Sequence, residues 1–175
     1  MSLQHLQFSP SEDKEGVKIK IRQELANYGF KITAEDFKRP WGGFFKINDK
    51  QNKLFINTFF KGINIPGEIL KLYLSPKILA VEPGKRLSWQ YHSRRGEFWR
   101  IIHGPVGVFL GNNDHLPQHY QTYQVGETAN IKPGTRHRVL GLDNWGMWAE
   151  LWVHLDKNNL SEESDIIRVS DDFGR

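Results

Sequence analysis

Four polar side chains in the middle of the chain have the types and the spacing of metal ligands. Gln90 and His92 are two residues apart, and Glu97 follows five residues after His92, in a segment that reads LSWQYHSRRGEFW. His137 lies further along, in the segment IKPGTRHRV. Imidazole nitrogens with carboxylate and amide oxygens suit Zn, Mn, Fe, Co or Ni, and such a set leaves a position for water or substrate. The residues therefore indicate a catalytic divalent metal.

The same residues also have an ordinary interpretation. A single histidine in a strand is more often a hydrogen-bonded structural residue than a ligand, and the other histidines of the chain are interpreted in that way. Spacing alone does not choose between four unrelated strand residues and one metal site. The choice depends on the elements that position them.

A strand, a turn and a second strand would bring the first three candidates together. Residues two apart in a strand point to the same face, so Gln90 and His92 project together. Residues 93–96 read SRRG and are predicted to form a hairpin turn, after which Glu97 opens the return strand and faces His92. A tight turn at Pro133-Gly134 starts the strand that carries His137. Closure of a barrel is expected to bring this strand against the first pair.

Short strands are predicted throughout the chain from residue 39 onward. Their expected ranges are 44–47, 54–60, 77–81, 87–92, 98–103, 106–110, 121–125, 128–131, 136–140 and 148–154. Turn residues separate them at fairly regular spacing. The predicted class is all-β, an antiparallel sandwich or barrel of which the jelly roll is one type.

The N-terminal residues have a different pattern. Apolar side chains recur at helical spacing at Val17, Ile21, Leu25 and Tyr28. Ser11 is a candidate cap for the start of this helix, and Gly29 is a candidate for its end. We therefore expect residues 1–38 to form a helical extension and residues 39–175 to form the main domain.

Composition restricts the chemistry and the partners. The chain has no cysteine, which excludes disulfides, thiolate metal sites and cysteine nucleophiles. Its net charge of +4 comes without a basic, aromatic-rich stripe, so no nucleic-acid partner is expected. No secretory leader and no apolar run of membrane-spanning length are recognised, so a cytoplasmic protein without membrane contact is expected. Exposed strand edges are compatible with a homodimer.

Two stretches resemble the paired motifs of the cupin superfamily. The first contains Gly84, Gln90, His92, Glu97 and Gly104, with Gln at the place of the first motif histidine. The second contains Gly126, Gly134 and His137. The resemblance implies a cupin jelly-roll β-barrel in which Gln90, His92, Glu97 and His137 hold the metal.

Four ordered blocks narrow the resemblance to type II mannose-6-phosphate isomerases. These enzymes form the C-terminal part of bifunctional proteins whose other half is a mannose-1-phosphate guanylyltransferase. The blocks read RPWG at 39–42, PGKRLSWQYH at 83–92 with Arg95, Glu97 and Trp99 after it, PGTRHR at 133–138, and DIIR with DDFGR at 165–168 and 171–175. The likeness covers residues 39–175, and no part of the chain resembles the guanylyltransferase half.

The resemblance implies a metal-dependent aldose–ketose isomerase for mannose 6-phosphate and fructose 6-phosphate, with Zn as the first expected ion. It assigns Arg175 to the catalytic site and to the substrate phosphate, with Arg95 and Arg138 as further phosphate ligands. Lys132 is the candidate proton carrier, although Asp171 and Asp172 are also available. No organic cofactor is expected.

Departures from the family pattern leave two alternatives open. The segments 57–76 and 111–120 are longer than in the family, and both are placed to line the barrel mouth. A cupin isomerase or epimerase for another sugar is therefore one alternative, and a non-catalytic sugar-binding cupin is the other. Trp41 and Trp99 are candidates to shape the sugar pocket, or else core residues.

Overall fold

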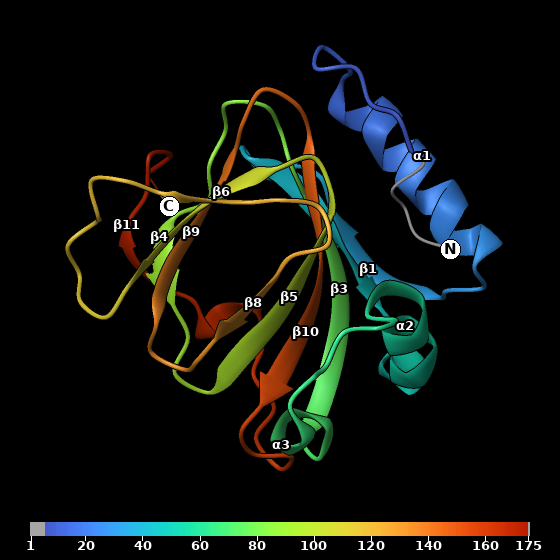
Figure 1. The fold of residues 1–175 in the computed structure, drawn as a ribbon, viewed down its shortest axis with the longest axis vertical. Helices are drawn as coiled ribbons and strands as arrows, with labels where there is room; N and C mark the ends of the chain where they lie inside the picture. Colours follow the sequence, from blue (N-terminus) through green and yellow to red (C-terminus); the bar gives the residue numbers. More distant parts are fainter. Residues whose placement is uncertain (1–5, 175) are drawn as a thin grey trace.

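In the computed structural model, which describes residues 6–174, two antiparallel β-sheets face each other (Figure 1). The six-stranded sheet has the order β1-β2-β3-β10-β5-β8, and the five-stranded sheet has the order β11-β4-β9-β6-β7. This arrangement confirms the predicted all-β jelly roll with a small helical N-terminal part.

The strands are β1 (Ile32–Asp36), β2 (Gly42–Ile47), β3 (Tyr73–Val81), β4 (Trp89–Tyr91), β5 (Arg95–His103), β6 (Val106–Gly111), β7 (Gln121–Tyr123), β8 (Thr128–Ile131), β9 (Arg136–Gly141), β10 (Gly146–His154) and β11 (Ile167–Ser170). The helices are α1 (Lys14–Asn27), α2 (Asn52–Phe59) and α3 (Gly67–Leu70), with the 3-10 turns η2 (Asp49–Gln51) and η3 (Glu163–Asp165). No helix within residues 6–174 is long and apolar enough to cross a membrane.

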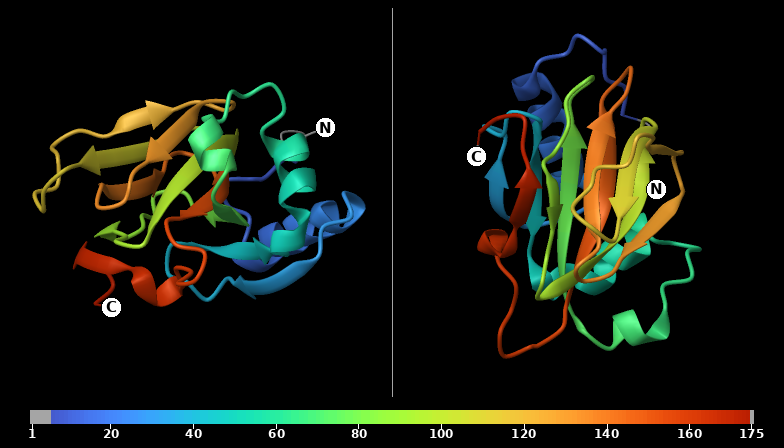
Figure 2. Two further views of the ribbon diagram at one scale, coloured as in Figure 1. Left: turned by 90° about the horizontal axis from the view of Figure 1, so that it is seen from below. Right: turned by 90° about the vertical axis from the view of Figure 1, so that its left-hand side faces the viewer.

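The central strands of the six-stranded sheet, β3, β10 and β5, are buried on both faces. On β10, the side chains of Ala149 and Leu151 belong to an outer core that also contains residues of α1 and α2. Trp148 belongs to an inner core between the two sheets. Successive strand residues point to opposite faces, so the alternation along β10 separates these two cores. Figure 2 shows α1 and α2 against the outer side of the sheet.

The N-terminal helix is shorter than the predicted extension. Asp13, and not Ser11, caps α1, because its side chain accepts a hydrogen bond from the Gly16 backbone N–H at 2.8 Å. Gly29 follows the helix with φ 78°, a left-handed conformation that glycine adopts without strain. Residues 32–36 then form β1, which pairs with β2 at the sheet edge. The boundary expected at residue 38 therefore falls between two paired strands.

The strand predicted over residues 54–60 is wrong, because this segment lies mostly in α2. Phe55 and Phe59 are fully buried and four residues apart, which is helical spacing, whereas Leu54 is exposed. A short apolar run fits both periods, so the pattern alone did not distinguish a helix from a strand. The helix packs on the outer face of the six-stranded sheet and adds Phe55 and Phe59 to the outer core.

Candidate metal centre

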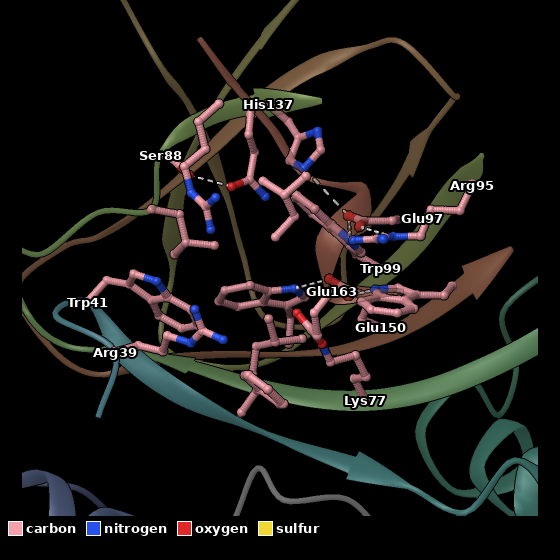
Figure 3. Close-up of a pocket in the computed structure, with 18 residues that line it drawn as sticks. Arg39, Trp41, Lys77, Ser88, Arg95, Glu97, Trp99, His137, Glu150 and Glu163 are labelled. Carbon is pink, nitrogen blue, oxygen red and sulfur yellow. Dashed lines mark hydrogen bonds and ion pairs between the residues drawn. The ribbon is translucent and has the colours of Figure 1, made fainter. Parts of the chain in front are cut away.

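Three of the four predicted ligands converge at a wall of the space between the sheets. His92 follows β4, Glu97 lies on β5 and His137 lies on β9. Glu97 Oε1 is 3.1 Å from His92 Nε2, and Glu97 Oε2 is 3.6 Å from His137 Nε2. One ligand atom from each residue lies within 4.8 Å of the other two, and all three side chains are buried. Figure 3 shows the His137 imidazole pointing toward the Glu97 carboxylate.

Backbone carbonyls fix the orientation of both imidazoles. His92 Nδ1 lies 3.0 Å from the carbonyl oxygen of Asp165, and His137 Nδ1 lies 3.0 Å from that of Thr135. A carbonyl oxygen only accepts, so each Nδ1 donates, and in the neutral ring each Nε2 keeps a lone pair. Both Nε2 atoms are on the side of Glu97. Metal-binding histidines are commonly held in this way by a hydrogen bond from the second ring nitrogen.

The charges at the cluster also suit a divalent ion. Burial alone would raise the pKa of Glu97, but its surroundings, with His92 first and Arg95 among them, hold that pKa well below its ordinary value. Burial lowers the pKa of His137 to about 4, so its imidazole is neutral at pH 7. One carboxylate and two imidazoles are a usual donor set for zinc and related ions. The residues therefore fit a divalent metal.

Gln90 lies next to this cluster but is not one of its three residues. It lies on β4, its Cα is paired with that of His137, and its buried side chain lines the cavity. The Gln90 amide oxygen accepts a hydrogen bond from the hydroxyl of Ser88. A carbonyl oxygen has two lone pairs, so one remains for a metal. Gln90 stays a predicted ligand.

Arg95 has a different place from the one predicted. The hairpin turn is two residues shorter than expected because β5 already begins at Arg95. Its Nε donates to Glu97 Oε1 at 3.2 Å, and its Nη1 donates to Ser161 Oγ at 2.8 Å and to the carbonyl of Glu162 at 3.0 Å. Its Nη2 lies 3.2 Å from His92 Nε2. These contacts commit the guanidinium to positioning Glu97, which leaves little capacity for a phosphate.

The other predicted cations lie away from the cluster. Arg138 is buried, forms an ion pair with Asp172 at 3.3 Å and is not among the residues that line the cavity. Lys132 is exposed and belongs to a separate surface pocket with Gly96. Arg175 lies outside the described residues. The described part of the chain therefore brings no predicted proton carrier to the cavity, and Asp172 is engaged by Arg86 and Arg138.

The cavity beside the cluster is lined by aromatic and charged side chains (Figure 3). Its tryptophans are Trp41, Trp99, Trp148 and Trp152, and its charged residues outside the metal cluster and Arg95 are Arg39, Lys77, Glu150, Glu163 and Arg168. Sequence reasoning did not select any of these five as a site residue. The sequence did contain a signal for Lys77 and Glu150, because each is the single charged residue in a mostly apolar strand.

The long segments do not line this cavity. No residue of 57–76 or of 111–120 is among the residues that form its wall. The first segment contains part of α2 and all of α3, and α2 packs behind the six-stranded sheet. The second segment is an almost wholly exposed polar loop after β6. The expectation that both segments line the mouth is therefore not supported for this cavity.

Comparison with known proteins places the site in a family. The family described as "Mannose-6-phosphate isomerase C-terminal" matches residues 67–171. Mannose-1-phosphate guanylyltransferase RfbM of Salmonella typhimurium is 27% identical over 78% of this chain and 22% of its own length. Xanthan biosynthesis protein XanB of Xanthomonas campestris pv. campestris is 31% identical over 57% of this chain and 19% of its own length. The chain thus spans about a fifth of these relatives.

A solved structure supports the fold. A variant of Bacillus subtilis oxalate decarboxylase OxdC superposes with a TM-score of 0.53, over 74% of this chain and 29% of that one, at 11% sequence identity. At this identity the likeness concerns only the arrangement of the strands.

Proposed function

The chain belongs to the family of mannose-6-phosphate isomerase C-terminal domains, and on this premise we propose that it is a metal-dependent isomerase that interconverts mannose 6-phosphate and fructose 6-phosphate. The observation that carries the proposal is the cluster of His92, Glu97 and His137 on the wall of a tryptophan-lined cavity. One of the relatives, RfbM, is by name a mannose-1-phosphate guanylyltransferase, which supports a sugar phosphate as the substrate class.

The residues of the cluster would hold a divalent ion, Zn first and Mn, Co, Fe or Ni as alternatives, with Gln90 as a fourth ligand. When bound, the ion supplies Lewis-acid polarisation of the sugar carbonyl and holds adjacent sugar oxygens in register. Arg95 keeps the Glu97 carboxylate in place. The surrounding indole rings exclude water and offer flat apolar faces to the sugar carbons.

The phosphate requires cations at the other end of the cavity. Arg39 and Arg168 both line the cavity, and Figure 3 shows Arg39 with Trp41 at the end opposite Arg95 and Glu97. A hexose 6-phosphate carries its phosphate at the end of the molecule distant from C1 and C2. We therefore assign the phosphate to Arg39 and Arg168, in place of Arg95 and Arg138, because guanidinium groups bind phosphate with paired hydrogen bonds. Arg175 remains a predicted ligand.

The test is a coupled assay for fructose 6-phosphate formed from mannose 6-phosphate, on protein whose metal content is measured before and after chelation. Turnover should disappear with the metal and return when Zn, Mn or Co is added. Glu97→Gln and His137→Ala should lose both metal and turnover, whereas His115→Ala, which changes an exposed loop histidine, should keep both. Turnover that survives in Glu97→Gln and His137→Ala would contradict the metal mechanism.

Bound metal without turnover would favour one of the two alternatives. A screen of other sugar phosphates would then distinguish an isomerase or epimerase for another sugar from a non-catalytic sugar-binding cupin. The position of the segments 57–76 and 111–120 away from the cavity argues against a change of substrate caused by them.

The phosphate assignment predicts a change in KM more than in kcat. Loss of one charged hydrogen-bond partner costs about 1.5–3 kcal/mol, which corresponds to about a tenfold to hundredfold rise in KM. Arg39→Ala and Arg168→Ala should show this rise, while Arg22→Ala, an arginine of α1 paired with Glu35, should not. An unchanged KM in both Arg39→Ala and Arg168→Ala would show that these two arginines do not bind the phosphate.

A further inference from the structure

Glu150 lies in the row of inward-facing residues at the centre of the six-stranded sheet. It is directly opposite Lys77 on β3 and Trp99 on β5. All three residues line the cavity that the metal cluster also borders, and Figure 3 shows Glu150 and Lys77 on the wall below His137. The row next to it pairs Trp152 with Glu97. Glu150 on β10 is thus separated from Glu97, the candidate metal ligand on the neighbouring strand β5, by one cross-strand pair.

Two indole groups fix the Glu150 carboxyl. Trp148 Nε1 donates to Glu150 Oε2 at 3.0 Å, and Trp152 Nε1 donates to Glu150 Oε1 at 2.6 Å. An indole N–H only donates, so neither partner can take a proton from the carboxyl. Each carboxyl oxygen keeps a further lone-pair position. The group is therefore held rigidly and stays able to exchange a proton with a molecule in the cavity.

Glu150 forms no ion pair with any residue of 6–174. The nearest lysine in its row, Lys77, pairs instead with Glu163 at 2.6 Å and lies over the rings of Phe44 and Trp152 at 4.0 and 4.2 Å. A fully buried carboxylate without a counter-ion is costly, so the surroundings favour the protonated form. Burial, with the nearby Glu97 charge, raises the pKa of Glu150 to about 8, against the opposing effect of Lys77.

The two carboxyl groups of the cavity therefore have opposite environments. Glu97 is surrounded by two imidazoles and a guanidinium. Glu150 is surrounded by indoles. The charged groups that face Glu150 are Lys77 from β3, Arg95 and Glu97 from β5, and Glu163 from η3. When two carboxyl groups of one site have such different environments, one commonly serves as a charged ligand and the other as the proton carrier.

We propose that Glu150 is the catalytic acid–base of this site and carries a proton between C2 and C1 of the sugar phosphate. The inference rests on the proposed isomerase function. As a carboxylate, Glu150 takes the proton from C2 of the open-chain aldose, and the C–H electron pair forms the C1–C2 double bond while the C1 carbonyl oxygen becomes negative. The O2 hydroxyl proton moves to O1 as the C2 carbonyl forms, and Glu150 returns its proton to C1. The product is the ketose, and the carboxylate is restored.

The first measurement is turnover in D₂O with NMR detection of deuterium at C1 of fructose 6-phosphate. A carboxyl that exchanges with solvent between the two steps places deuterium there, whereas a direct shift of hydrogen from C2 to C1 does not. Glu150→Gln should lower kcat by about 10²- to 10⁴-fold, the usual contribution of an acid–base group, with metal content and KM within about twofold of the parent. Glu68→Gln, an exposed glutamate of α3, is the matched control and should keep kcat.

A second readout does not depend on turnover. The infrared spectrum at neutral pH should contain the C=O stretch of a buried protonated carboxyl, and this band should be absent from Glu150→Gln. Glu150→Asp should recover part of kcat, and the rise of kcat with pH in the parent should be lost in Glu150→Gln.

The outcomes separate the two proposals. If the metal-loaded parent turns over and Glu150→Gln does so within about threefold of it, the role of Glu150 is wrong and the isomerase function stands. If the metal-loaded parent does not convert mannose 6-phosphate, the isomerase function itself is wrong, and the role of Glu150 is overturned with it.

Discussion

At the scale of single residues, the neighbours of Glu97 and Glu150 decide what each carboxyl can do. Glu97 is held by Arg95 and faces two imidazole lone pairs, so it is a carboxylate ready for a cation. Glu150 is held by two indole N–H groups and has no cation in contact within the described chain. Both are buried glutamates on adjacent strands. Residue type alone therefore does not determine their chemistry.

The environment of Glu150 predicts a pH dependence of stability. Its pKa is about 8 in the folded protein and 4.5 in the ordinary state, so between these values the folded protein holds a proton that the unfolded chain has lost. Unfolding then releases a proton, and the free energy of unfolding falls as pH rises through this window. Glu150→Gln removes the contribution and should become more stable relative to the parent from pH 4.5 to 8.

The measurement is urea unfolding of the metal-free parent and of Glu150→Gln across this pH range, because metal release would otherwise add its own pH dependence. Other groups titrate in both proteins and cancel from the difference. A difference in unfolding free energy that is constant between pH 5 and pH 8 would show that Glu150 is already ionised in the folded protein.

The sequence predicted that His92, Glu97 and His137 lie together, as they do, but it did not predict the residues that hold them in place. Alternation along β4 and the turn after it were sufficient to expect His92 near Glu97, and the second motif added His137. The contacts of Arg95 could not be predicted, because its partners Ser161 and Glu162 are more than 60 residues away and lie in an irregular segment. Arg39 and Arg168 likewise lie far apart in the sequence, although they line the same cavity in the folded chain.

At the scale of secondary-structure elements, α2 shows where pattern analysis was insufficient. Its apolar residues satisfy strand and helix periods equally over so short a run. The tertiary structure decides between them, because the outer face of the six-stranded sheet needs a cover and Phe55 and Phe59 supply it. Residues 32–36 were missed as a strand for a related reason. Their side chains are mostly exposed or half-buried, so they carry little apolar signal.

The position of α2 predicts a stability effect without a catalytic one. Phe55 is fully buried against Phe30 and Phe59, and removal of a buried phenylalanine side chain costs about 3–5 kcal/mol. Phe55→Ala should lower the free energy of unfolding by about this amount, as measured by urea unfolding. Leu54→Ala, which changes an exposed neighbour, should cost under about 1 kcal/mol.

The folded fraction of Phe55→Ala should retain the KM of the parent, since α2 lies behind the sheet and not in the cavity wall. A large change in KM at a temperature where the variant is folded would mean that the outer core and the cavity are coupled.

At the scale of the whole molecule, the candidate metal ligands come from both sheets. His92 and His137 come from the five-stranded sheet and its margin, whereas Glu97 comes from the six-stranded sheet. An ion bound by all three would therefore connect the sheets and would be released on unfolding. Ligands that bind only the folded state raise stability by mass action, by about 2.7 kcal/mol at a free concentration one hundred times Kd.

We therefore expect the melting temperature to rise with added Zn or Mn and to fall to the metal-free value after chelation. Thermal unfolding at several metal concentrations measures this. Glu97→Gln should show little or no rise, whereas His115→Ala should respond as the parent does. A rise of equal size in Glu97→Gln would locate the stabilising ion elsewhere in the protein.

The tryptophans around the cavity have an optical consequence. Four of the six tryptophans of the chain line this one space, and the ring of Trp99 is 5.5 Å from the ring of His137. The intrinsic fluorescence of the protein is therefore emitted largely from the walls of its candidate active site. Paramagnetic ions such as Mn, Co or Ni should quench it on binding, and Zn should not, so emission would distinguish a site loaded with Zn from one loaded with a paramagnetic ion.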